Sequence, residues 1–89
     1  MSLSAIAAAP AIAPMYRLQY EQAQGLWVLL YPEGMVKLNG PAGEILRRCD
    51  GRRSVHELVG ELQRSYGESD LHDDVCQFLR DAHDRGWIV

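Results

Sequence analysis

The spacing of apolar residues divides the chain into an extended first half and a helical second half. Residues 15–21 (MYRLQYE) alternate between apolar and polar side chains, which predicts a half-buried strand. Residues 26–31 (LWVLLY) are apolar throughout and too few for a typical helix, so they predict a second, more deeply buried strand. Residues 32–34 (PEG) predict a tight turn in which the glycine supplies a positive φ angle. Residues 35–38 (MVKL) then predict a short third strand, and the three runs together indicate an antiparallel meander.

After the third strand the apolar spacing changes to the period of a helix. Asn39 or Gly40 is expected to cap the first helix, and Asp50-Gly51 is expected to end it. Its apolar stripe is spaced i, i+3, i+4, i+7 and consists of Ala42, Ile45, Leu46 and Cys49.

Two further helices follow. Residues 54–57 (SVHE) form a capping-box sequence that opens the second helix, and Gly67 is expected to close it. The third helix is expected to begin near Ser69 or Asp70 and to stop at Gly86. Its apolar stripe consists of Leu71, Val75, Phe78, Leu79 and Ala82. The order of elements predicts an α+β fold, a three-stranded antiparallel sheet followed by three helices, similar to a winged helix.

Length and composition restrict the class of protein. The 89 residues suffice for one domain, assigned to residues 15–89, while the uncharged, Ala- and Pro-rich residues 1–14 are expected to form a flexible arm outside it. Residues 87–89 (WIV) are expected to fold back onto the core. Two cysteines, no convincing signal peptide and no apolar run long enough to span a membrane indicate a cytoplasmic protein with reduced thiols and no membrane partner.

The sequence offers little for catalysis or for metal binding. His72 and Cys76 share a helix face, but they lack a close third ligand, since His83 lies about 10 Å further along the axis. Cys49 ends an apolar stripe and is interpreted as a core thiol, although His56 as a spatial neighbour is left open. The expectation is a binding protein, not an enzyme, with no metal and no cofactor.

Two surface features are candidates for contacts with partners. The third strand is expected to lie at the sheet edge, where its unpaired backbone groups can accept an added strand; the alternative is a short solvated edge protected by Lys37. Four arginines fall within seven residues and are interpreted either as a solvated helix end or as a patch for an acidic partner. They are Arg47, Arg48, Arg52 and Arg53.

An ordered set of short motifs resembles the PqqD family of pyrroloquinoline quinone (PQQ) biosynthesis. The resemblance covers roughly residues 15–89 and includes YPEG at 31–34, CDG at 49–51 and GW at 86–87. The remaining matches are Leu38-Asn39, Ile45-Leu46, Val55, Leu58, Asp74-Val75 and Phe78-Leu79. Ala82 departs from the pattern, because a larger aliphatic residue is expected there, and residues 1–14 lie outside it.

The resemblance implies a peptide chaperone that contains a recognition element for ribosomally made peptides. Such proteins bind the precursor peptide PqqA and present it to PqqE, a radical S-adenosylmethionine enzyme that crosslinks a glutamate and a tyrosine of the peptide. By this resemblance the peptide adds as a strand to the third strand and lies against the third helix. The implied strand partners are Met35, Val36, Lys37, Leu38 and Asn39, and the implied helix wall is Val75, Gln77, Phe78 and Asp81.

The sequence also leaves open an alternative function, a second binding surface and the oligomeric state. A winged-helix DNA-binding protein is the alternative, although a net charge of −3 and an acidic third helix disfavour a nucleic-acid partner. The arginine cluster is a candidate docking surface for the partner enzyme. The expected oligomeric state is a monomer or, because the sheet edge is open, a strand-exchanged dimer.

Overall fold

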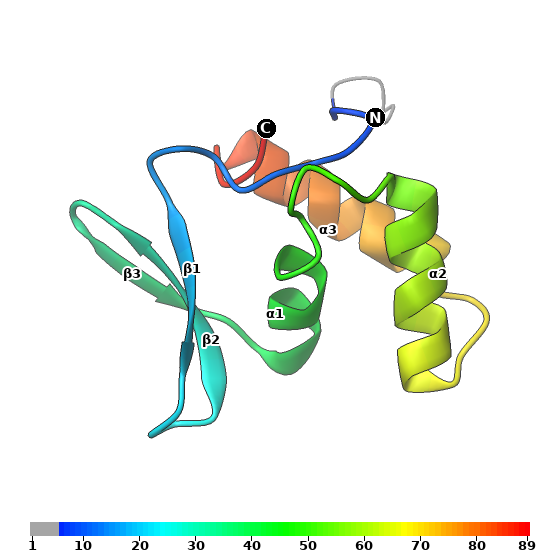
Figure 1. Ribbon diagram of the computed structural model, residues 1–89, viewed down its shortest axis with the longest axis horizontal. Coiled ribbons are helices and arrows are strands. Elements are labelled where there is room, and N and C mark those ends of the chain that lie inside the picture. Colours follow the sequence, from blue (N-terminus) through cyan, green and yellow to red (C-terminus); the bar gives the residue numbers. More distant parts are fainter. Residues whose placement is uncertain (1–5) are drawn as a thin grey trace.

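The computed structural model describes residues 6–89 and has the predicted α+β fold. Figure 1 shows the sheet on one side of the molecule and the three helices on the other. The elements are β1 (Arg17–Glu21), β2 (Leu26–Tyr31), β3 (Gly34–Lys37), α1 (Gly40–Leu46), α2 (Val55–Tyr66) and α3 (His72–Asp84). The three strands and three helices of the sequence analysis are therefore confirmed, with shifts of one to three residues at some ends.

The sheet is an antiparallel meander in the order β1-β2-β3, so that β3 forms one edge. Two residues connect β2 to β3, because Tyr31 pairs directly with Gly34. The prediction of a positive φ at Gly34 was wrong, since in the described chain only Gly25, Gly51, Gly67 and Gly86 have one. Gly34 is the first residue of β3, not a central turn residue, and therefore adopts ordinary extended backbone.

The first helix is capped as predicted but is about a turn shorter than its apolar stripe. The side chain of Asn39 accepts a hydrogen bond of 2.8 Å from the backbone N–H of Ala42. After Leu46 the backbone tightens, because the N–H of Cys49 bonds to the carbonyl of Leu46, three residues earlier. Cys49 therefore reaches the core from the exit of α1 rather than from the helix itself.

The helix boundaries that depend on capping chemistry follow the sequence closely. Ser54 and Glu57 form the predicted capping box at the start of α2, and Gly67 ends it with a φ angle of 66°. The start of α3 was predicted two or three residues too early. No side chain caps α3 at Leu71, whose backbone N–H instead bonds to the side chain of Gln63 in α2.

The expectation of a free N-terminal arm was wrong for residues 6–14, while residues 1–5 lie outside the described part of the chain. Ile6 and Pro10 are buried, and the segment runs beside the C-terminal residues (Figure 1). Ala11 exchanges two backbone hydrogen bonds with Val89, and Ala13 donates one to Trp87. The C-terminal tail does fold back onto the core as predicted, and the N-terminal segment is what pairs with it.

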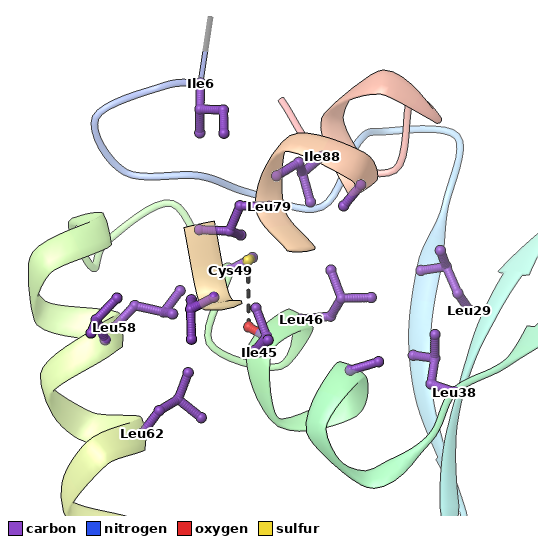
Figure 2. Close-up of a cluster of buried hydrophobic side chains, with 14 residues drawn as sticks. Ile6, Leu29, Leu38, Ile45, Leu46, Cys49, Leu58, Leu62, Leu79 and Ile88 are labelled. Carbon is purple, nitrogen blue, oxygen red and sulfur yellow. Dashed lines mark hydrogen bonds between the residues drawn. The ribbon is translucent and has the colours of Figure 1, made fainter. Parts of the chain in front are cut away.

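One core joins the sheet, the helices and both terminal segments. Figure 2 shows Leu29 and Leu38 from the sheet side facing side chains of the helices, with Ile6 and Ile88 closing the cluster. At the junction of sheet and helices, Trp27 lies against the backbone of α1. A Cβ atom added at Gly43 would lie only 2.6 Å from Cδ1 of Trp27, so glycine is required for this approach.

Candidate functional site

The edge of β3 leaves backbone hydrogen-bonding groups unpaired. The N–H of Leu38 bonds to the carbonyl of Trp27 in β2, and hydrogen-bonded positions alternate along an antiparallel pair. Val36 therefore also points its backbone groups toward β2, whereas Met35 and Lys37 point theirs away from the sheet. The open edge thus offers two residues, with an N–H and a C=O each, to an added strand.

The side chains of this edge divide in the same alternating way. Leu38 is buried and Val36 is half-buried against the core, while Met35 and Lys37 are exposed. The strand is anchored by its core-facing residues and has few features that would block its free edge. Lys37 is the single charge on β3.

An apolar hollow of about 420 Å³ lies between α1 and α3, beside Asn39, which stands two residues after the end of β3. We call it the α1–α3 hollow. Its walls come from the start of α1, the end of α2 and the first half of α3. The lining residues are Asn39, Pro41, Ala42, Ile45, Leu62, Tyr66, Glu68, Leu71, Asp74, Val75 and Phe78.

The hollow brings together only part of the implied peptide site. Asn39, Val75 and Phe78 line it. Gln77 and Asp81 do not; both are exposed on α3 and their side chains hydrogen-bond to each other at 3.1 Å. Asn39 connects the two features, because it ends the extended backbone of β3, caps α1 and lines the hollow.

Sequence reasoning missed the contributions of α1 and α2 to this hollow. Ile45 was assigned only to the apolar stripe of the first helix, and Pro41, Leu62 and Tyr66 were not among the implied site residues, yet all four line the hollow. Periodicity identifies the apolar face of a helix, but it does not reveal where two such faces fail to meet.

Arginines of the cluster form ion pairs with carboxylates of the same chain. Arg48 is not available at the surface, because its side chain is only 7% exposed and bonds to Glu44 at 2.8 Å and to Glu61 at 3.2 Å. Arg53 bonds to Glu61 and to Asp50, each at 2.8 Å. These ion pairs tie α1 and the loop after it to α2.

The same contacts perturb the carboxylates. The hydrogen bond from Arg48 to Glu44 is the main reason that the pKa of Glu44 lies below its ordinary value. For Glu61 the pKa is lowered chiefly by the hydrogen bond from Arg53. Arg47 also bonds to Glu44, but its side chain is 40% exposed, so Arg47 and Arg52 are the cluster members left at the surface.

The two thiols are structural. Burial is the main reason that the pKa of Cys49 rises to about 12, and its Sγ donates to the carbonyl of Ile45 at 3.5 Å (Figure 2). Cys76 is buried, and its Sγ lies 3.6 Å from Nε2 of His72. Within residues 6–89 no group of three or more His, Cys, Asp or Glu side chains is arranged to hold a metal ion. Nor does any helix of this part of the chain have the length and apolarity to cross a membrane.

The charge of α3 does not suit nucleic acid. In a winged helix this element reads the DNA groove, yet here it carries four aspartates against one arginine. They are Asp73, Asp74, Asp81 and Asp84, with Arg80 as the single basic residue besides two histidines. Such a balance repels a phosphate backbone, which disfavours the DNA-binding alternative.

Known proteins are similar to this chain in sequence, and one solved structure is similar to it in fold. A family model described as coenzyme PQQ synthesis protein D (PqqD) matches residues 27–88. A protein of Pseudomonas paraeruginosa named "PqqA binding protein" is 46% identical over 89 residues, covering 99% of this chain and 97% of its own. A protein of the same name from Methylococcus capsulatus is 43% identical over 77 residues, covering 86% of this chain and 83% of its own.

A solved structure has the same fold across the whole chain. It is the solution structure of the PqqD part of PqqCD from Methylobacterium extorquens, described as a stand-alone recognition element for ribosomally made, modified peptides. Its TM-score is 0.75 at 22% identity, and the match covers 100% of this chain and 99% of that one. The relatives are named as binding proteins, in agreement with the expectation that the chain is not an enzyme. The chain belongs to the PqqD family.

Proposed function

We propose that this protein binds the precursor peptide PqqA in PQQ biosynthesis by adding it as a fourth strand to the edge of β3. The observation that carries the proposal is the open edge of β3, which leads through Asn39 directly to the α1–α3 hollow. Backbone groups of Met35 and Lys37 supply hydrogen bonds to any extended peptide. The hollow supplies selectivity, because it accepts an apolar side chain of the same peptide.

The side chains of the implied site have different roles in this arrangement. Val36 and Leu38 hold β3 on the core, while Val75 and Phe78 form the apolar wall on α3. Gln77, Asp81 and the rest of the exposed α3 surface flank the peptide without lining the hollow.

Proline at position 37 tests strand addition. Lys37→Pro removes an outward N–H that the fold itself does not use, and proline is tolerated at such edge positions. One lost hydrogen bond of about 1 kcal/mol weakens PqqA binding about fivefold. Lys37→Ala is the matched control, because it removes the same side chain and keeps the N–H. Equal affinities of the two variants for PqqA, measured by isothermal titration calorimetry, would exclude β3 as the docking edge.

Position 36 serves as a second control on the geometry. The N–H of Val36 faces β2, so Val36→Pro breaks the hairpin itself and is expected to lower the unfolding midpoint. A Val36→Pro variant that keeps wild-type stability while losing PqqA affinity would reverse the assignment of inward and outward positions.

The second half of the proposed function is presentation of the peptide to the radical enzyme PqqE. The exposed Arg47 and Arg52 are the members of the arginine cluster that remain available for docking. Charge reversal of both residues is expected to weaken the complex with PqqE and to leave PqqA binding unchanged. An undiminished complex with PqqE, detected by size-exclusion chromatography, would remove these arginines from the docking surface.

A further inference from the structure

The mouth of the α1–α3 hollow is acidic. Its lining includes two carboxylates, Glu68 and Asp74, and no lysine, arginine or histidine. Both residues are exposed. The remaining lining is mainly apolar, so the hollow joins an apolar interior to a negatively charged rim.

These two carboxylates have no basic partner within residues 6–89, in contrast to the carboxylates near the arginine cluster. Helix stability explains only one of them. Asp74 lies in the first turn of α3, where a negative charge is favourable. Glu68 directly follows the C-terminal end of α2, where a negative charge opposes the helix dipole. The fold therefore gives no reason for a carboxylate at position 68.

We propose that the peptide bound at β3 places a large apolar side chain in the α1–α3 hollow and, beside it, a lysine or arginine that pairs with Asp74 and Glu68. This inference rests on the proposed function and specifies which peptide residues are read. The volume of the hollow is within the range of pockets that hold small molecules, about 300–1,000 Å³. The aliphatic stem of a lysine or arginine suits the exposed ring of Tyr66, which lines the hollow, because such stems cover apolar surface while the charged end stays in water.

Neighbouring aspartates on α3 provide a matched test. Asp73 and Asp74 both lie in the first turn of α3, so their replacement by lysine changes net charge and helix-dipole energy equally. Only Asp74 lines the hollow. Asp74→Lys is expected to weaken binding of synthetic PqqA about threefold to tenfold, as removal and reversal of an exposed ion pair imply. Asp73→Lys is expected to change it less than about twofold.

The peptide side of the pair completes the test. PqqA variants with each lysine or arginine replaced in turn by glutamate are titrated against wild type, Asp74→Lys and Glu68→Lys. At one PqqA position, the glutamate variant is expected to bind the wild-type protein more weakly. The same peptide variant is expected to regain affinity for Asp74→Lys or Glu68→Lys. Equal effects of Asp73→Lys and Asp74→Lys, or the absence of a position with such rescue, would overturn the inference while leaving strand addition intact. Failure of wild type to bind PqqA would instead refute the proposed function together with it.

Discussion

Replacing Gly43 by alanine tests the contact that joins the sheet to the helices. In an ordinary helix interior this change stabilises, because alanine is favoured over glycine by about 0.5–1 kcal/mol. Here the new Cβ would lie 2.6 Å from Cδ1 and 3.0 Å from Cβ of Trp27. The Cβ of Trp27 cannot rotate away, since it is fixed by the backbone of β2. Steric crowding is therefore expected to outweigh helix propensity.

The expected magnitude follows from these opposed effects. Inserting a methyl group into a well-packed core typically costs about 1–3 kcal/mol. After subtraction of the helix gain, Gly43→Ala is expected to be less stable by up to about 2.5 kcal/mol, with a central value of about 1 kcal/mol that lowers the melting temperature by roughly 4–8 °C. Gly60→Ala is the control in α2, because its new Cβ meets only the flexible end of Arg64 at 3.4 Å. This second variant is expected to be more stable by about 0.5–1 kcal/mol.

Urea unfolding followed by circular dichroism measures both free energies in one experiment. The predicted result is opposite signs for the two glycine variants. If Gly43→Ala were as stable as the wild type, Trp27 would have room to move, and the close approach of β2 to α1 would not be a constraint on the fold. Because α1 carries part of the hollow wall, Gly43→Ala is also expected to weaken PqqA binding.

Three further predictions concern charge, thiols and the N-terminal segment. The pKa values of Glu44 and Glu61 are lowered in the folded state. The ionised carboxylates therefore stabilise the fold above their ordinary pKa of 4.5, and this stabilisation is lost as the pH falls below that value. A urea unfolding midpoint that stays constant from about pH 6 to about pH 3 would contradict this prediction. Cys49, with a pKa of about 12, is expected to resist a thiol reagent at neutral pH until the protein unfolds, and fast labelling of the native protein would count against its burial. Removal of residues 1–13 exposes core and frees Val89, so it is expected to destabilise by about 2 kcal/mol or more, whereas an unchanged midpoint would return this segment to the role of a free arm.

The sequence predicted the elements of this fold well where local chemistry decides them. The capping box at Ser54 and the cap at Asn39 both set helix starts that the structure has. Alternation places Val36 and Leu38 on one face of the third strand, and in the structure that face is the one toward the core. These features depend on neighbours within a few residues, which a single sequence displays directly.

Apart from the φ angle of Gly34 and the start of α3, the errors concern contacts between distant parts of the chain. Residues 6–14 have the composition of a loose arm, yet Ala11 and Ala13 pair with the last three residues of the chain. Their burial depends on a partner about 75 residues away, which composition does not indicate. The burial of Arg48 could not be predicted for the same reason. An arginine is usually a surface residue, and Arg48 is buried here because it pairs with Glu61 of α2.

Only part of the candidate site could be predicted, because the rest of it also depends on contacts between distant parts of the chain. The edge position of β3 follows from the order of strands, which a meander fixes. The hollow depends on how α1, α2 and α3 diverge, so Tyr66 and Leu71 could not be assigned to it from their spacing. On α3 the side chains of Val75 and Phe78 line the hollow, whereas Gln77 and Asp81 do not.

An amide NMR titration of the isotope-labelled protein with synthetic PqqA tests the central claim most directly. The predicted result is a saturable set of shifts at residues 35–39 together with the hollow-lining residues of α3, from 74 to 78. The protein should remain folded throughout, with little change along the outer surface of α2. A folded spectrum without shifts, or shifts confined to surfaces remote from β3, would contradict peptide binding by strand addition at this edge.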